Sequence, residues 1–360
     1  MDPTHLQTLY ALSRKGLKQL GQSDLTEEVK NLLSSLPKKN GWLTSAPLYQ
    51  YQNFWYPAVQ LQALLNIQRN FQALDTDLVV VTNPKCGTTW LKALSFAIVN
   101  RFQFHFDNPT SKQYHPLLTN NPHILVPYLE YFYMIDQNPD LTCLSFGTAR
   151  LLSTHIPHAS LPDSIKDSKC KLVYLCRDPK DTFISFWHFS NKLRPKNTED
   201  TSFEEAFEKF CEGVVDFGPF WDNVLGYWKM SLESPERVCF LKYEEMKKEP
   251  KIHLLKLAEF LGVPFSVEEE NDGVPEQILK LCSFDNLSNL EVNKTGKIAG
   301  IGFSVYFRRG EVGDHVNHLT LEMIERFDKI NEQKFLDSGG KENEEMLDLN
   351  RTAKRRVGKT

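Results

Sequence analysis

A strand, a turn and a helix follow one another three times along this chain, and this repetition restricts its fold more than any other feature. The strand-like runs are short and apolar, and they cover residues 77–82 (DLVVVT), 171–176 (KLVYLC) and 237–241 (RVCFL). The helical patterns that follow them cover residues 90–100, 181–189 and 244–261. Units of this kind predict an α/β fold in which helices flank both faces of a central parallel β-sheet.

Length and composition favour one globular domain. Of the 360 residues 41% are apolar, which is enough to bury a large core. We expect the domain to span residues 25–337, between a flexible N-terminus (1–24) and a disordered polar tail (338–360). The aromatic segment 42–57 favours either a loop packed on the core or one wall of a ligand pocket.

Charge, hydropathy and cysteine usage exclude several classes of protein. The net charge of −4 lacks the basic balance that is typical of nucleic-acid binding. The N-terminus has no signal-peptide pattern and the longest apolar runs are strand-sized, so we predict neither secretion nor a membrane partner. Seven cysteines without CxxC spacing indicate reduced thiols and a cytoplasmic protein. Ten histidines without HExxH-like spacing predict no metal site.

The turn after the first strand has the composition of an anion-binding loop. It reads TNPKCGTTW at residues 82–90 and leads into a helix, whose N-terminal N–H groups attract anions. Gly87 allows a close approach of the backbone, and Lys85, Thr88 and Thr89 add a charge and two hydroxyls. The Lys precedes the Gly, unlike in a Walker A loop. The turn therefore predicts a P-loop-like phosphate site, with an ordinary strand–helix turn as the alternative.

The turn after the second strand carries a further cation. Arg177 directly follows this strand, a position suited to bidentate contact with a phosphate, and Ser185 comes eight residues later. Taken alone, an arginine–aspartate pair at the surface explains Arg177 equally well. Because ligands of parallel sheets bind at the carboxyl ends of strands, the two turns together predict two anion sites about one nucleotide apart.

Several stretches together resemble the cytosolic sulfotransferases that use 3′-phosphoadenosine 5′-phosphosulfate (PAPS). The first turn is similar to the family's 5′-phosphosulfate loop, YPKSGTTW, and YLCRDPKDTFISFWHF (174–189) is similar to its 3′-phosphate motif. The stretch 307–314 (FRRGEVGD) resembles the C-terminal RKGxxGDW signature. LCSFDNLSNLEVNK (281–294) and LLSSLPKKNGW (32–42) are similar to the plant branch.

The resemblance implies a reaction and a set of residues for it. A sulfuryl group would move from PAPS to a hydroxyl of a small molecule by direct in-line transfer, with release of adenosine 3′,5′-bisphosphate (PAP) and without a metal. His155 would be the catalytic base, and Lys85 would steady the bridging oxygen of the leaving group. The implied donor-binding residues are Lys85, Cys86, Gly87, Thr88 and Thr89 at the 5′-phosphate, Trp90, Tyr243, Ser283 and Phe284 at the adenosine, and Arg177, Ser185, Arg308, Arg309 and Gly310 at the 3′-phosphate.

Four positions depart from the family pattern. Cys86 stands in place of the usual Ser of the loop, which implies the loss of one hydroxyl donor. Ser153 stands where animal members carry a second active-site Lys, and Cys282 replaces a Thr near the adenine. His315 replaces the Trp of the GDW signature, a change that the sequence alone does not explain.

The acceptor remains open at this level. Relatives in plants act on flavonoids, on steroids such as brassinosteroids, on hydroxyjasmonates and on desulfoglucosinolates. Apolar and aromatic stretches at 42–57, 128–146 and 287–306 are the expected pocket walls, and they favour a phenolic or alicyclic hydroxyl. An ATP-dependent kinase and a nucleotide-binding scaffold without catalysis are the competing interpretations.

The expected oligomeric state is a monomer or a weak homodimer. Animal members often dimerise through a KxxxTVxxxE motif. The matching stretch 316–325 keeps Thr320 and Glu325, but Val316 replaces the Lys and Leu321 the Val. A small interface that loses a charged anchor is expected to weaken.

Overall fold

The structure is a computed structural model, and it describes residues 25–42, 46–104, 115–146, 149–194, 201–298 and 300–337. The flexible ends predicted at 1–24 and 338–360 lie outside these residues and stay predictions. The strands are β1 (Lys38–Asn40), β2 (Pro47–Tyr51), β3 (Phe54–Pro57), β4 (Leu78–Thr82), β5 (Ser145–Phe146), β6 (Ala149–Thr154), β7 (Lys171–Cys176), β8 (Val238–Lys242), β9 (Lys297–Ile298) and β10 (Ile301–Gly302). The helices of the N-terminal half are α2 (Glu27–Ser35), α3 (Ala58–Asn70), α4 (Thr88–Asn100), α5 (Pro122–Leu125), α6 (Leu129–Ile135), α7 (Asp163–Asp167) and α8 (Pro179–Leu193). Those of the C-terminal half are α9 (Phe203–Cys211), α10 (Phe220–Glu233), α11 (Tyr243–Lys248), α12 (Pro250–Phe260), α13 (Val267–Asn271), α14 (Val274–Leu281), α15 (Phe284–Asn289), α16 (Glu291–Thr295) and α17 (Leu321–Asp337).

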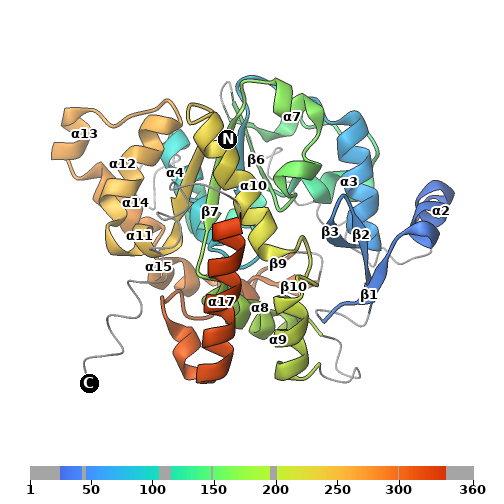
Figure 1. Ribbon diagram of the computed structural model, residues 1–360. Helices are drawn as coiled ribbons and strands as arrows, with labels where there is room; N and C mark the ends of the chain where they lie inside the picture. The colour runs from blue at the N-terminus through green and yellow to red at the C-terminus, as the bar shows by residue number, and fades with distance from the viewer. Residues whose placement is uncertain are drawn as a thin grey trace.

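The predicted parallel sheet is confirmed as the centre of a single α/β domain (Figure 1). Its strand order is β5-β6-β4-β7-β8, in which β6, β4, β7 and β8 run parallel and the short edge strand β5 runs antiparallel to β6. The strand-like runs predicted from the sequence became β4, β7 and β8 within one residue at each end. Strand β6 was not predicted.

Helices cover both faces of this sheet, which explains the uninterrupted apolar run of β4. Successive side chains of a strand point to opposite faces. Val79 and Val81 pack into a core with α3, α8 and α10, whereas Leu78 and Val80 pack into a second core with α4, α12 and α14. Figure 1 shows α12 and α14 on one side of the sheet and α3 on the other. Every position of β4 is therefore buried.

The helical pattern predicted over 244–261 is two helices. Helix α11 ends at Lys248, and the N–H of Glu249 closes its last turn on the carbonyl of Glu245 at 2.9 Å. Pro250 begins α12, because a proline has no N–H to continue a helix but fits the first helical position. The long apolar face of residues 254–261 thus belongs to α12 and the turn after it.

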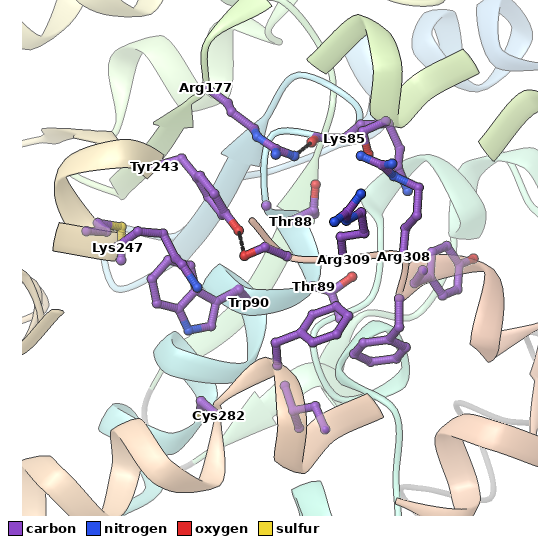
Figure 2. Close-up of a pocket in the computed structure, with 18 of the residues that line it drawn as sticks. Lys85, Thr88, Thr89, Trp90, Arg177, Tyr243, Lys247, Cys282, Arg308 and Arg309 are labelled. Carbon is purple, nitrogen blue, oxygen red and sulfur yellow. Dashed lines mark hydrogen bonds between the residues drawn. The ribbon is translucent and has the colours of Figure 1, made fainter. Parts of the chain in front are cut away.

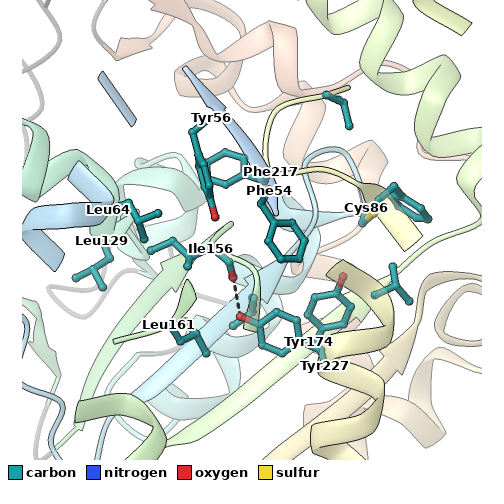
Figure 3. Close-up of a cluster of buried hydrophobic side chains, with 14 of the residues drawn as sticks. Phe54, Tyr56, Leu64, Cys86, Leu129, Ile156, Leu161, Tyr174, Phe217 and Tyr227 are labelled. Atoms are coloured by element: carbon teal, nitrogen blue, oxygen red, sulfur yellow. Dashed lines mark hydrogen bonds between the residues drawn. The ribbon is translucent and has the colours of Figure 1, made fainter. Parts of the chain in front are cut away.

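The aromatic segment is a hairpin, although the sequence favoured a loop or a pocket wall. Strands β2 and β3 pair antiparallel, and β1 extends this small sheet. The backbone of Trp55 exchanges two hydrogen bonds of 2.8 Å with Phe217 and Gly218, which fastens the hairpin to the 213–219 turn. Tyr56 packs edge-on against Phe217 at 5.8 Å between ring centroids (Figure 3).

Two stacked tyrosines support the segment that follows β6. The rings of Tyr174 on β7 and Tyr227 on α10 stack with centroids 4.4 Å apart. The Tyr227 hydroxyl donates a 2.7 Å hydrogen bond to the carbonyl of Ile156, as Figure 3 shows. Ile156 is the neighbour of His155, so the hydrophobic core itself fixes the backbone at this position.

Candidate active site

The carboxyl ends of four parallel strands meet at one edge of the sheet, and a predicted site residue follows each of them. His155 follows β6, Lys85 lies in the turn after β4, Arg177 follows β7 and Tyr243 follows β8. Since the strand order is β6-β4-β7-β8, these residues occur in the same order across the edge. The sequence predicted two neighbouring strand ends here, and the fold brings four together.

A cavity of about 320 Å³ opens at this edge (Figure 2). It is lined by all the predicted site residues except Cys86, namely Lys85, Gly87, Thr88, Thr89, Trp90, His155, Arg177, Ser185, Tyr243, Ser283, Phe284, Arg308, Arg309 and Gly310. These residues come from the β4–α4 turn, from the ends of β6, β7 and β8, and from the C-terminal third of the chain. One continuous cavity therefore joins the two predicted anion sites to the predicted base.

The β4–α4 turn is built for a close approach to a ligand. Lys85 and Gly87 have positive φ angles of 71° and 101°. A Cβ on Gly87 would lie 2.8 Å from the ring of Tyr243, so no larger residue fits. Helix α4 then begins at Thr88, whose hydroxyl lies 2.7 Å from that of Thr82. The first N–H groups of a helix have no partner within it, and here they lie at the cavity.

Cys86 turns away from the cavity into the core. Its Sγ lies 3.5 Å from the hydroxyl of Thr182, and its backbone N–H donates to the carbonyl of Asn83 at 3.3 Å. Burial raises the pKa of the Cys86 thiol to about 12, so the side chain is a neutral thiol. A side chain at this position does not reach the cavity, and the exchange of Ser for Cys removes no hydroxyl from it.

The side chain of Lys85 is half-buried among other cations. Its Nζ lies 4.1 Å above the ring of Phe189. Burial and the neighbouring positive charges, that of Arg177 first among them, lower the pKa of Lys85 to about 7. An anion in the cavity would reverse this effect, because a negative charge favours the protonated amine.

Arg177 is held in place at the carboxyl end of β7. Its Nη2 donates a 2.7 Å hydrogen bond to the carbonyl of Glu311, and its guanidinium lies 4.6 Å from the ring centroid of Tyr243. Its Nε is buried and has no partner among the described residues. Tyr243 in turn donates a 3.0 Å bond to the carbonyl of Gly310, shown as a dashed line in Figure 2. Arg177 therefore has one N–H group that no described residue uses.

Two more arginines complete the cation cluster. Arg308 and Arg309 share the carboxylate of Asp314, at 2.6 Å and 2.9 Å from its two oxygens. Figure 2 shows both arginines beside Lys85. The buried Asp314 orients the two guanidinium groups without neutralising the whole cluster, so the cavity keeps a positive field that suits a polyanion.

The structure explains the histidine that replaces tryptophan in the GDW signature. The backbone N–H and Nδ1 of His315 both contact Asp181, at 3.0 Å and 2.8 Å from Oδ1, and the N–H of Gly313 donates to Oδ2 at 2.7 Å. Burial acts to raise the pKa of Asp181, but these hydrogen bonds and Arg177 lower it to about 2. His315 thus ties the stretch 307–314, which carries Arg308 and Arg309 and is called the arginine loop below, to α8 through an ionised carboxylate.

His155 presents one ring nitrogen to the cavity as an acceptor. Its Nδ1 lies 2.6 Å from the carbonyl oxygen of Thr82, which can only accept, so Nδ1 carries the hydrogen and Nε2 the lone pair. Burial lowers the pKa of His155 to about 3, and the charges of Lys92 and Lys85 act in the same direction. The imidazole is neutral at physiological pH, as a proton acceptor must be.

A buried carboxylate fixes the backbone around this histidine. Oε1 of Glu130 accepts hydrogen bonds from the N–H of His155 at 2.8 Å and from the hydroxyl of Thr154 at 2.9 Å. Ser153, which stands where animal members carry a second lysine, donates instead to the carbonyl of Pro127 at 2.9 Å. Its side chain is buried and leaves the cavity without a cation at this position.

Sequence reasoning missed His123 as a residue of the cavity and included Tyr128 and Tyr306 only within two expected pocket walls. His123 lines it, although we expected a structural or surface role, and so do Tyr128 and Tyr306. The ring centroids of Tyr128 and His155 are 4.5 Å apart, and those of His123 and Tyr306 are 4.2 Å apart. Tyr128 and Tyr306 end two of the predicted pocket walls, so that part of the expectation had a usable signal.

The third predicted wall does not reach this cavity. None of the lining residues comes from the aromatic hairpin. Phe217 separates the hairpin from the site, since its ring lies 5.8 Å from Tyr56 on one side and 5.4 Å from His155 on the other. The hairpin supports the wall of the site from behind.

Two glycines of the arginine loop offer a matched test of the cavity. Gly310 and Gly313 both have positive φ, 68° and 85°, so alanine at either position is expected to cost ~1–2 kcal/mol of stability. A Cβ at Gly310 would lie 2.5 Å from the ring of Phe284, whereas one at Gly313 would meet nothing within 4 Å. We expect Gly310→Ala alone to weaken PAP binding, by about tenfold, because the strain falls on the cavity wall. Calorimetric titration of both variants checks this, and equal PAP affinities would contradict it.

Other possible sites add little in the part of the chain that the structure describes. No group of three or more histidine, cysteine, aspartate or glutamate side chains is placed there to hold a metal ion. No helix within the described ranges has the length and hydropathy that crossing a membrane requires.

Comparison with known proteins shows the family of the chain. A family profile described as "Sulfotransferase domain" matches residues 75–339. Cytosolic sulfotransferase 5 of Arabidopsis thaliana is 50% identical over 88% of this chain and 97% of the relative, and cytosolic sulfotransferase 12 of the same plant is 49% identical over 89% and 95%. The expected cytoplasmic location accords with these names.

Solved structures show the same fold. A putative steroid sulphotransferase of Arabidopsis thaliana superposes with a TM-score of 0.69 at 42% identity, over 90% of this chain and 98% of the other. Mouse sulfotransferase SULT7A1 superposes with a TM-score of 0.62 over 87% and 99%, and at 23% identity this likeness concerns the fold alone. On the family profile and these relatives, the chain belongs to the sulfotransferase family and, within it, to the cytosolic sulfotransferases of plants.

Proposed function

We propose that the chain transfers a sulfuryl group from PAPS, bound in the cavity at the carboxyl edge of the sheet, to a hydroxyl of a small apolar acceptor. The observation that carries this proposal is the shared cavity of a cation cluster and a neutral histidine. Lys85, Arg177 and Arg308 suit a nucleotide with phosphates at both ends, and His155 suits a hydroxyl that must lose a proton.

The cavity fits the donor on several grounds. The β4–α4 turn offers helix N–H groups and Lys85 to the 5′-phosphosulfate, and Gly87 keeps the backbone open. At the other end, the unpartnered Nε of Arg177 and the hydroxyl of Ser185 suit the 3′-phosphate. Trp90 lies edge-on to Tyr243 at 5.6 Å and supplies an indole for the adenine. The mouse relative of the same fold is described as complexed with PAP.

In the proposed transfer, His155 and Lys85 act on the reacting groups, and Glu130 and Thr82 orient His155. PAPS supplies a sulfuryl group on a phosphosulfate anhydride, whose 5′-phosphate is the leaving group. Nε2 of His155 takes the proton of the acceptor hydroxyl while that oxygen attacks sulfur. Lys85 places positive charge where negative charge grows on the leaving oxygen, which stabilises the transition state more than the ground state. Glu130 and Thr82 hold His155 in the orientation and tautomer that this step needs.

The surroundings of His155 favour an apolar ring on the acceptor. Tyr128, Phe189 and Tyr306 line the cavity on this side. Aromatic walls suit a phenolic or alicyclic hydroxyl, as in a flavonoid, a steroid or a hydroxyjasmonate. The 42% identical relative is described as a putative steroid sulphotransferase, which supports the steroid class. A desulfoglucosinolate is the alternative acceptor.

The donor is tested by thermal unfolding with three nucleotides. We expect PAP at a hundredfold excess over its Kd to stabilise the fold by ~2.7 kcal/mol, because it binds only the native state. Adenosine 5′-phosphosulfate, which lacks the 3′-phosphate, and ATP should stabilise it far less. Arg177→Ala should remove most of the effect of PAP, while Arg326→Ala, at an exposed ion pair with Glu208, should retain it. Equal stabilisation by PAP and adenosine 5′-phosphosulfate would sink the assignment of Arg177, and preference for ATP would favour a kinase.

The oligomeric state stays a prediction. Val316 and Leu321, which replace residues of the animal dimer motif, are exposed by 56% and 76%. Both side chains are apolar, and neither offers the charge that the motif uses. The loss of the charged anchor supports a monomer or a weak homodimer.

A further inference from the structure

A lysine lies buried behind the wall of the cavity, where the proposed mechanism gives it no part. Lys92 belongs to α4, seven residues after Lys85, and its side chain is fully buried. Its Nζ lies 3.4 Å from the ring centroid of Tyr128 and 3.2 Å from Nδ1 of His123. Burying an amine costs much free energy, so its contacts are of interest.

These contacts form a chain that ends at the cavity. Nδ1 of His123 faces Lys92. The other ring nitrogen, Nε2, lies 2.9 Å from Oγ1 of Thr89, at the start of α4. Thr89 lines the cavity, whereas Lys92 does not. The order from core to cavity is Lys92, His123 and Thr89, each joined to the next by one hydrogen bond.

The direction of the hydrogen bonds in this chain depends on the lysine. Burial first, and then the charge of Lys92, lower the pKa of His123 well below its usual value, so the ring is neutral and carries one N–H. If Lys92 donates to Nδ1, the N–H must be on Nε2 and must donate to Thr89 Oγ1. The hydroxyl hydrogen of Thr89 is then available for another acceptor, and Thr89 lines the cavity. The opposite direction requires a lone pair on Lys92, which a neutral amine has and a protonated amine lacks, so protonation of Lys92 fixes the direction.

We propose that Lys92 and His123 are positioning residues of the donor site, which together keep the Thr89 hydroxyl turned outward as a hydrogen-bond donor to the 5′-phosphosulfate. The proposal rests on the donor site proposed above. Burial lowers the pKa of Lys92 well below its usual value. The carboxylate of Glu130 acts to raise it, and the anionic donor would act in the same sense as Glu130 and favour the protonated amine. Binding of the donor therefore favours the arrangement in which the Thr89 hydroxyl donates a hydrogen bond to the 5′-phosphosulfate.

A double-mutant cycle on PAP affinity tests this chain. Lys92→Met keeps the length of the side chain but removes its donors, and we expect it to raise the Kd of PAP about tenfold, the effect of losing one hydrogen bond to a charged group. Thr89→Val should raise it by a similar factor. In the Thr89→Val background, Lys92→Met should change the Kd less than twofold, because the hydroxyl that Lys92 would position is then absent. Ser95→Ala, at another buried polar side chain of α4, is the matched control and should leave the Kd unchanged.

The tautomer of His123 gives a second readout that a purely structural lysine would not move. In the PAP complex, ¹⁵N chemical shifts should report the hydrogen on Nε2 of His123 in the wild type and a different or mixed tautomer in Lys92→Met. A hydrogen on Nδ1 in the wild-type complex would overturn the proposal, as would fully additive Kd effects. If these occur while Arg177→Ala still weakens PAP binding, the donor site stands and only the role of Lys92 falls. If the wild type does not bind PAP, both proposals fail.

Discussion

His155→Ala is expected to lower kcat by ~10²–10⁴-fold, the range in which a positioned general base contributes, and to leave PAP affinity nearly unchanged. The reason is the place of its action. In the proposed mechanism the lone pair on Nε2 takes the proton of the acceptor, so its contribution arises in the transition state and not in donor binding. Steady-state kinetics with saturating donor, together with calorimetric titration of PAP, separates the two quantities.

A second histidine of the same segment is the control for this variant. His158 packs against Tyr227 at 5.8 Å between ring centroids and does not line the cavity. His158→Ala should therefore keep kcat within a few-fold of the wild type, although it also removes an imidazole near β6. If His155→Ala retained more than about a tenth of the wild-type kcat, the cost of a lost base would be missing and another group would have to take the proton.

Lys85→Ala should differ in kind, because turnover and donor affinity are both expected to fall. Loss of a charge aimed at the leaving oxygen typically costs ~10²–10³-fold in kcat. In the proposed complex the same amine also contacts the 5′-phosphate in the ground state, so we expect the Kd of PAP to rise at least about tenfold. A variant that lost turnover with unchanged PAP affinity would place Lys85 away from the donor.

The pH dependence of PAP binding gives a sharper form of this prediction. With a pKa of about 7 in the free protein, Lys85 loses its proton as the pH rises above 7, and binding of an anion must then restore it. The Kd of PAP should therefore rise from pH 7 to pH 9, by up to about tenfold per pH unit. Lys85→Arg, which stays protonated in this range, should make the profile flat. A flat profile in the wild type would contradict the lowered pKa.

Local sequence carried enough information for three strands of the central sheet and for the two turns of the proposed donor site. An apolar run such as LVVVT, followed by a turn with Gly and Lys and then by a helical pattern, has few solutions other than a buried strand leading into a helix. The residues of that turn are close in sequence, so their closeness in space needs no tertiary information. The helix break at Pro250 was also readable, because a proline that follows Lys248 and Glu249 argues against one continuous helix.

Strand β6 could not be recognised in the same way. It reads ARLLST, and it is followed by His155 and a Pro-containing segment instead of a helix. No turn signal marks its end, so its pairing with β4 is decided by hydrogen bonds between residues some 70 positions apart, such as Val81 opposite Thr154. This pairing sets His155 beside the β4–α4 turn.

The amino-acid sequence by itself determined the α/β class and the family to which the chain belongs, and it predicted an anion-binding turn, since each depends on neighbours along the chain. Only the tertiary structure decided that Cys86 faces the core, that the aromatic hairpin stands behind Phe217, and that Lys92 reaches Thr89 through His123. The direction of a side chain at a turn, and the partner of a buried amine, depend on which elements pack around it. That packing joins α4, α5 and β6, whose residues are too far apart in sequence for any local pattern to relate them.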